Sequence, residues 1–378
     1  MRILVLNYEF PPIGGGGGAV TKDICRGLAQ KGHEVRVQTS RMKGLPAVEK
    51  IDGYTVYRTF AFRRYRDRCL TPELAAYIVT NTLPSLWHAI TWKPDVIHVH
   101  FAVPTGVIAT LVWRLTGIPY VLTVHSGDVP GAKPDKTEHI FRYIKPLTVP
   151  IWERAGAVIS VGPSTTQYAE AAYDVPIETI LNGINPDLHD VSPLEPHQPV
   201  RLVFIGRFRP IKRPVFLLEV LARIKDLDWT LDMIGDGPIM GQALQRLEEL
   251  DLGDRVTMHG WLSPKDAAAI MSQEDILCIP SSVEGLPIVG LNALGHGLAI
   301  VGSDIIGLDG VIVDGLNGCR CPVDDHASFE AALRGLLTAD DTIRRMKAAS
   351  RELAGNFHID GVVDRYLEIF ERVRRDYH

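Results

Sequence analysis

The sequence contains no long hydrophobic run, and this absence excludes a membrane-spanning segment. The best candidate, between Val107 and Val124, is interrupted by Arg114, whereas a spanning helix needs about 20 consecutive apolar residues. The N-terminal apolar run, Ile3 to Leu6, is too short for the core of a signal peptide. We therefore expect a cytoplasmic protein.

Cysteine is scarce, and its distribution excludes a disulfide framework. The five cysteines are odd in number and scattered along the chain, as expected for reduced thiols. Cys319 and Cys321 are too close together for the usual spacing of a zinc site and have no neighbouring histidine. We interpret them as strand residues.

Strong positive charge is also absent. Residues 1–190 carry 20 basic and 17 acidic side chains, and residues 191–378 carry 20 and 28. Neither half has the basic character of a nucleic-acid-binding domain, which excludes nucleic acid as a partner. Any phosphate-binding site must therefore be formed by a few basic residues at one place and not by a domain that is basic overall.

The chain has the length and the pattern of two α/β domains. Its 378 residues exceed what one hydrophobic core usually fills. Short β-branched runs alternate with helical patterns, which predicts two Rossmann-like, doubly wound domains with parallel sheets. The predicted strands are 3–8, 34–39, 54–58, 95–99, 120–124 and 157–161 in the first series, and 201–205, 230–234, 255–258, 276–279 and 298–301 in the second.

A segment without apolar periodicity separates the two series. Pro193 to Pro199 predicts a linker, which gives domains at residues 1–190 and 191–357. A last helix, within residues 358–378, has an apolar face formed by Val362, Val363, Tyr366, Ile369 and Phe370. We expect this face to pack back on the first domain, because it would otherwise be exposed.

A glycine-rich segment follows the first predicted strand. Gly14 to Gly18 precede the helical run Ala19 to Gln30, at the carboxyl end of a strand, where open α/β sheets bind ligands. Glycine lets the backbone approach a ligand, and a helix N-terminus attracts anions. A ligand-binding loop and a flexible surface turn both fit the pattern. The spacing is not the dinucleotide fingerprint, so NAD is disfavoured.

Charged residues follow two strands of the second series. Arg207 and Lys212 lie between a strand end and a helix start, where two cations would bind a diphosphate; a solvated basic loop is the alternative. Glu284 precedes Asn292 by eight positions, so both side chains would reach one ligand. For Glu284 the alternative is a helix cap.

Residues 57–68 contain five arginines interleaved with aromatic side chains. Such a segment would make a peripheral membrane contact through anionic lipid headgroups, or would guide a phosphorylated acceptor. An exposed basic loop with a few packed aromatic residues is the alternative.

The order of these motifs resembles that of the retaining GT-B glycosyltransferases of family four, also called group 1. Each motif is weak alone, but their number, order and spacing over nearly the whole chain are specific. The motifs are Pro11-Pro12 with the glycines, Lys31-Gly32-His33-Glu34-Val35, Asp95-Val96-Ile97-His98-Val99-His100, Thr123-Val124-His125, Asn182-Gly183, Gly206-Arg207 with Lys212, Ile234-Gly235-Asp236-Gly237-Pro238, Glu284-Gly285 and Asp314-Gly315-Leu316-Asn317-Gly318.

The resemblance implies a nucleotide-sugar donor held mainly by the second domain, a hydroxyl acceptor held mainly by the first, and no metal or other cofactor. The implied catalytic residues are His125, Arg207, Lys212 and Glu284. The implied donor-binding residues are Gly15, Gly16, Gly17, Gly18, Gly206, Trp261, Leu262, Gly285, Leu286, Pro287, Ile288 and Asn292. The implied acceptor-binding residues are His100 and Asp128. His98 and His100 share a strand, and we expect one to face the core and the other the ligand.

Three positions depart from the family pattern. Asn292 stands where a glutamate usually binds the ribose, Ala299 where a proline is common, and Gly310 where a glutamate often precedes the last valine-rich stretch. An uncharged Asn292 should bind ribose through hydrogen bonds roughly half as strong.

The expected activity is transfer of a hexose-type sugar, with retention, from a UDP or GDP sugar to a glycan, lipid or small-molecule hydroxyl. Such a reaction belongs to polysaccharide or glycolipid biosynthesis. The alternatives are an inactive GT-B protein that binds a nucleotide or glycan, and a sugar-nucleotide epimerase. The sequence does not select the nucleobase, the acceptor or the oligomeric state.

Overall fold

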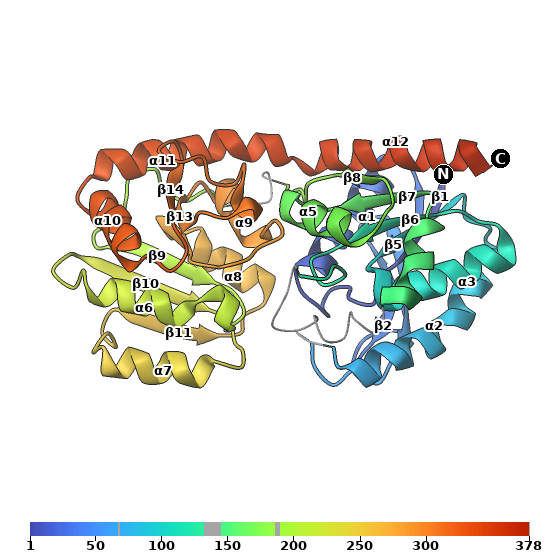
Figure 1. Ribbon diagram of the computed structural model, residues 1–378, viewed down its shortest axis with the longest axis horizontal. Helices are drawn as coiled ribbons and strands as arrows, with labels where there is room; N and C mark the ends of the chain where they lie inside the picture. The colour runs from blue at the N-terminus through green and yellow to red at the C-terminus, as the bar shows by residue number, and fades with distance from the viewer. Residues whose placement is uncertain (67–68, 132–144, 186–189, 378) are drawn as a thin grey trace. The chain divides into compact units, whose positions relative to one another are not determined.

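The computed structural model describes residues 1–66, 69–131, 145–185 and 190–377. Its contacts divide the chain into two compact units, Met1–Gly183 with Ile359–His378, and Ile184–His358. Each unit is built around its own sheet with helices on both sides (Figure 1). The predicted pair of Rossmann-like α/β domains is thereby confirmed.

The first unit contains an eight-stranded sheet in the order β3-β4-β2-β1-β5-β6-β7-β8. Among the strands that the structure describes in this sheet, β3 and β4 are antiparallel and the other neighbours are parallel. The sequence patterns missed β3 and β8, because both are short and neither contains a fully buried residue. The strands are β1 (Arg2–Leu6), β2 (Glu34–Arg41), β3 (Val48–Ile51), β4 (Tyr54–Phe60), β5 (Val96–His100), β6 (Tyr120–Val124), β7 (Ala157–Ser160) and β8 (Ile177–Thr179).

Two groups of helices cover this sheet. One group contains α2 and α3, which pack side by side on a core that includes Leu4, Ile97 and Ile108. The other contains α1 and the C-terminal helix α12, which also contacts β5 and β6. The last helix therefore packs on the first unit. The helices are α1 (Gly16–Gln30), α2 (Thr71–Thr91), the short η1 (Ala102–Gly106), α3 (Val107–Thr116), α5 (Pro163–Ala172) and α12 (Ile359–Tyr377).

The second unit contains a six-stranded sheet in the order β11-β10-β9-β12-β13-β14, in which all neighbours are parallel. Cys319 and Cys321 lie in β14, as predicted. The strands are β9 (Val200–Ile205), β10 (Trp229–Ile234), β11 (Val256–Gly260), β12 (Ile276–Ile279), β13 (Ala299–Ser303) and β14 (Gly318–Cys321). The helices are η3 (Pro210–Lys212), α6 (Pro214–Ala222), α7 (Met240–Glu249), α8 (Pro264–Met271), α9 (Ile288–His296), η4 (Ile306–Leu308), α10 (His326–Leu337), α11 (Asp340–Ala354) and η5 (Gly355–Phe357).

The second unit begins at Ile184, earlier than the predicted boundary at residue 191. The segment interpreted as a linker is held by polar contacts at the start of β12. Ser192 Oγ donates to the Glu274 carbonyl at 2.6 Å, and the His197 amide donates to Asp275 at 2.9 Å. Polar contacts of this kind do not affect the periodicity of apolar residues, so the sequence pattern placed the domain boundary too late.

Helix α1 begins at Gly16 rather than at Ala19. The predicted glycine loop is therefore in large part the first helical turn. Glycine is a poor helix former, and local propensity alone placed the start too late.

Candidate functional site

Lys212 and Glu284 form an ion pair at the carboxyl edge of the second sheet. Lys212 follows β9 and Glu284 follows β12, and these two strands are neighbours. The Ser282 amide donates to the Ile211 carbonyl at 2.9 Å, which ties the two loops together. The strand order reverses between β9 and β12, and open α/β sheets bind ligands at such a switch point.

Two glycines fix the backbone around this pair. A Cβ on Gly235 would lie 1.9 Å from the Gly206 carbonyl oxygen, and one on Gly307 would lie 2.1 Å from that of Glu284. Neither position accepts a side chain without moving the backbone. Gly307 was not among the predicted site residues, although a glycine shortly after a strand was the available signal.

Glu284 is buried, with 9% of its surface exposed. It does not cap a helix, because α9 begins only at Ile288, has Pro287 at its N-cap and receives no side-chain cap. The alternative interpretation of Glu284 as a cap is therefore wrong.

The other predicted donor-binding residues lie along the same edge of the sheet. Gly206 and Arg207 directly follow β9, and residues 285–288 connect Glu284 to α9, which carries Asn292. Trp261 and Leu262 follow β11, and the Trp261 side chain is half exposed. Within the second unit, the structure brings all of these residues to the carboxyl ends of the strands.

The start of α1 packs against His125 in the first unit. A Cβ on Gly17 would lie 2.8 Å from Phe101 Cζ and 3.4 Å from His125 Cε1. The Phe101 and His125 rings stack with centroids 4.4 Å apart. Phe101 has a φ of 73°, a conformation that costs a non-glycine residue free energy. The sequence analysis missed Phe101, because no local pattern marks a left-handed phenylalanine.

The buried carboxylate of Asp128 joins the loops after β5 and β6. One oxygen accepts from the Ala102 amide at 2.9 Å, and the other accepts from the His125 amide at 3.0 Å. These contacts give Asp128 a positioning role for His125. Its predicted contact with an acceptor stays a prediction.

His98 and His100 both point to the same side of β5. Their ring centroids are 4.3 Å apart and both side chains are fully buried. The expectation that one faces the core and the other the ligand is wrong, because residues i and i+2 of a strand share a face. His100 Nδ1 lies 3.2 Å from His125 Nε2, so His100 reaches the edge of the sheet only through His125.

Burial keeps these two histidines neutral. It lowers the pKa of His98 to about 3, and together with the nearby imidazoles of His98 and His125 it lowers the pKa of His100 well below its ordinary value. His98 Nε2 lies 2.9 Å from Thr123 Oγ1, which lies 3.2 Å from Tyr366 Oη. Helix α12 thus supports the histidine stack.

Only some of the arginines in residues 57–68 are exposed. Arg58 lies in β4, is buried and pairs with Glu49 of β3 at 2.6 Å. Arg63 is also buried, whereas Arg64 and Arg66 are exposed. Arg68 lies outside the described residues. The interpretation of residues 57–68 as an exposed basic loop is therefore wrong for Arg58 and Arg63, because both side chains are buried.

Within residues 1–66, 69–131, 145–185 and 190–377, no group of three His, Cys, Asp or Glu side chains could hold a metal ion. No helix in the same ranges combines the length and the hydropathy needed to cross a membrane.

Solved structures with the same fold span nearly the whole chain. Sucrose-phosphate synthase from Thermosynechococcus elongatus superimposes with a TM-score of 0.81 at 20% identity, over 98% of each chain. The Anabaena protein HepE in complex with UDP-glucose gives a TM-score of 0.76 at 15% identity, over 98% of this chain and 100% of that one. These likenesses establish the GT-B fold.

The sequence comparisons cover both units. The N-acetyl-alpha-D-glucosaminyl L-malate synthase of Bacillus anthracis is 27% identical over 97% of this chain and 96% of its own length. The 2-deoxystreptamine N-acetyl-D-glucosaminyltransferase of Streptomyces fradiae is 27% identical over 95% and 91%. The family described as Glycosyltransferase Family 4 matches residues 14–188, and that described as Glycosyl transferases group 1 matches residues 199–339. The chain therefore belongs to the group 1 glycosyltransferases of the GT-B fold.

Proposed function

We propose that the protein transfers a hexose-type sugar from a nucleotide diphosphate sugar to a hydroxyl acceptor, with retention of configuration and without a metal ion. The observation that carries the proposal is the Lys212–Glu284 ion pair at the switch point between β9 and β12. It offers a cation to a diphosphate and a carboxylate to sugar hydroxyls at one place. Arg207, at the end of β9, supplies the second cation.

A uridine nucleotide is the donor that the comparisons favour. Two of the relatives are named for N-acetylglucosaminyl transfer, and the HepE structures contain UDP or UDP-glucose. We propose Trp261 and Leu262 as neighbours of the nucleobase and Asn292 as the partner of the ribose. The acceptor is a hydroxyl of a glycan, a lipid or a small molecule.

The reaction breaks the bond between the anomeric carbon and the diphosphate oxygen, and the bonding electrons leave with the diphosphate. Arg207 and Lys212 stabilise this growing negative charge, which is the largest electrostatic contribution available at the site. The acceptor oxygen bonds to the anomeric carbon on the same face, and its proton passes to the departing phosphate. Glu284 binds hydroxyls of the donor sugar and forms no covalent intermediate.

His125 is the residue of the first unit that we assign to the reacting sugar. Asp128 holds its backbone and His100 contacts its ring. Both are positioning residues in this proposal, because His100 is fully buried and both carboxylate oxygens of Asp128 accept from backbone amides.

Donor turnover tests the proposal. Thermal-shift screening with UDP, GDP and ADP identifies the nucleotide, since a bound ligand stabilises the folded state by mass action. The corresponding nucleotide sugars are then incubated with and without hydroxyl acceptors in EDTA, and NMR reports the anomeric configuration of the product. A product that has the same anomeric configuration as the donor sugar, formed without added metal, supports the proposal. Donor conversion without an acceptor would instead identify an epimerase, and nucleotide binding without turnover would identify a binding protein.

A further inference from the structure

Helix α2 exposes an apolar stripe from Val79 to Ile90. The exposed fractions are 75% for Val79, 73% for Leu83, 53% for Trp87 and 57% for Ile90. These positions recur every three or four residues, so they share one face. The only carboxylate on the helix, Glu73, is buried. A helix on the surface of a soluble domain normally carries polar residues on its outer face.

The neighbouring helix α3 extends this surface. Its exposed residues are Val107, Leu111, Arg114 and Leu115. Helices α2 and α3 pack side by side, and neither exposes a carboxylate. We call the exposed side chains of Val79, Leu83, Trp87, Ile90, Leu111, Arg114 and Leu115 the α2–α3 face.

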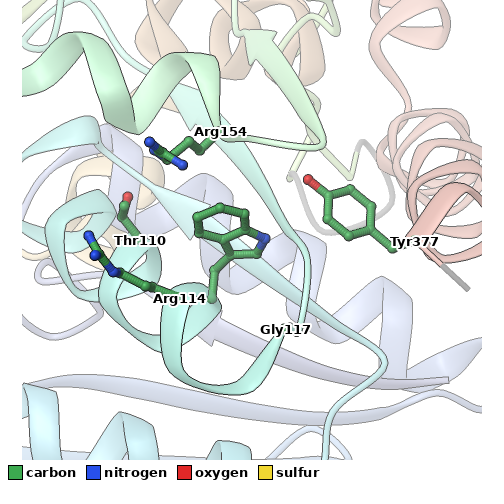
Figure 2. Close-up of a pocket in the computed structure, with 6 residues that line it drawn as sticks. Thr110, Arg114, Gly117, Arg154 and Tyr377 are labelled. Carbon is green, nitrogen blue, oxygen red and sulfur yellow. The ribbon is translucent and has the colours of Figure 1, made fainter.

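A basic pocket lies at the end of α3. It has a volume of about 520 Å³ and is lined by Thr110, Trp113, Arg114, Gly117, Arg154 and Tyr377. The Arg154 guanidinium lies 5.3 Å from the centroid of the Trp113 ring. Figure 2 shows Arg114 and Arg154 flanking the Thr110 hydroxyl, with the Tyr377 ring farther from this hydroxyl than either arginine.

Among the described residues that line this pocket, the charged side chains are Arg114 and Arg154. None of its lining residues is acidic, and neither arginine forms an ion pair with any residue in the described ranges. Two guanidinium groups at one place suit a phosphate group. The Thr110 hydroxyl donates to the Gly106 carbonyl at 2.8 Å, so the two arginines are the side chains that would hold the phosphate. Trp and Tyr, which also line the pocket, are the aromatic residues enriched where membrane and water meet.

We propose that the α2–α3 face docks on a lipid bilayer that contains anionic phospholipids. The apolar side chains enter the headgroup region, and Arg114 and Arg154 bind a lipid phosphate. The association is interfacial, since an amphipathic surface of this kind lies in the plane of the membrane. This surface is different from residues 57–68, and the inference does not depend on the proposed function.

Charge favours a bilayer over a second copy of the chain. In a two-fold dimer the same patch meets itself, so Arg114 and Arg154 of one copy would approach those of the other. The exposed faces of α2 and α3 offer no carboxylate to pair with them. An anionic bilayer provides both the apolar phase and the opposite charge.

Cosedimentation of the full-length protein with vesicles tests the proposal. We expect binding to vesicles of phosphatidylcholine mixed with phosphatidylglycerol, weaker binding to phosphatidylcholine alone, and loss of the difference at high salt. The double variant Leu83→Ser, Trp87→Ser should bind both kinds of vesicle roughly tenfold more weakly or worse. The double variant Arg114→Gln, Arg154→Gln should lose roughly fivefold per arginine on the anionic vesicles only.

A matched control is Leu244→Ser, which changes an exposed apolar residue on α7 of the second unit. It should leave vesicle binding unchanged, and thermal unfolding should show that all variants are folded. Absence of binding by the unmodified protein overturns the proposal. So does a dimer in light scattering that Leu83→Ser, Trp87→Ser dissociates without altering vesicle binding, since a second copy would then cover the face.

Discussion

The ammonium of Lys212 and the carboxylate of Glu284 meet although 72 positions separate them in the chain. The pair exists because β9 and β12 are adjacent in the sheet and because their loops share the hydrogen bond from Ser282 to Ile211. Gly307 packs directly against the backbone of Glu284, so the loop that carries Glu284 cannot shift toward Gly307. The charges of Lys212 and Glu284 are thus held in place by backbone packing.

Replacing Glu284 with glutamine tests the role of this pair. Glu284→Gln keeps the size of the side chain but removes the negative charge that pairs with Lys212 and that we propose accepts from sugar hydroxyls. We expect kcat/KM for the nucleotide sugar to fall by roughly 100-fold, measured by donor consumption. Glu249→Gln, which removes an exposed ion pair with Arg246 on α7, should leave it unchanged. Equal losses in the two variants would contradict the role of Glu284.

Gly17 at the start of α1 permits a paired test. A Cβ added by Gly17→Ala would lie 2.8 Å from Phe101 Cζ and would push the helix away from His125. We expect turnover to fall by roughly tenfold or more, since misplaced groups at a reacting centre are costly. At Gly361, on α12 of the same unit, an added Cβ meets no atom within 4 Å, so Gly361→Ala is the control. Normal turnover in Gly17→Ala would show that the close packing of Gly17 on Phe101 is not needed for activity.

His100 should act through His125, and two substitutions separate this from simple packing. His100→Phe keeps a buried ring but removes the Nδ1 atom that contacts His125 Nε2 at 3.2 Å. His100→Asn retains a polar atom near the position of Nδ1. We expect kcat to fall by roughly tenfold in the phenylalanine variant and to recover in large part in the asparagine variant. Steady-state kinetics measure both variants. Similar KM values with a lower kcat in His100→Phe would support a positioning role for His100, and equal kcat values in His100→Phe and His100→Asn would contradict it.

The stability of the second unit should depend on pH through Glu274. Burial and the neighbouring charge of Asp232 raise the pKa of this carboxyl from 4.5 to about 9. Between these values the folded state holds a proton that the unfolded state releases, so stability falls as pH rises. The loss is as much as about 1.4 kcal/mol for each pH unit in this window.

Glu274→Gln removes this titration. The variant should unfold at a higher temperature than the unmodified protein at pH 8 and should gain little at pH 5. Thermal unfolding followed at both pH values makes the comparison. An equal gain at the two pH values would mean that shape, rather than protonation, sets the effect.

The sequence predicted the buried parts of the fold better than the exposed parts. The ranges of β6 and β12 match the predicted strands, because each is a buried apolar run between loops. Strand β3 is half exposed and pairs with β4 alone. Its absence from the prediction also hid the partner of Arg58, since Glu49 lies on β3.

The candidate site was predictable to the extent that its residues follow strands. The sequence predicted that Arg207, Lys212 and Glu284 each follow a strand. The structure confirms these positions, since Arg207 and Lys212 follow β9 and Glu284 follows β12. The ion pair between Lys212 and Glu284 required the spatial order of the strands. The surroundings of His98 required the contacts of α12, which come from the opposite end of the chain.

The return of α12 to the first unit has a consequence during synthesis. Residues 359–377 leave the ribosome only after the whole of Ile184–His358 has been made, a delay of roughly ten to thirty seconds at ordinary elongation rates. During that interval Tyr366 and Phe370 have not yet covered His98, and the nascent first unit presents an open hydrophobic flank to chaperones. A ribosome stalled before codon 359 would therefore hold an unfinished N-terminal domain, however completely its sheet had formed.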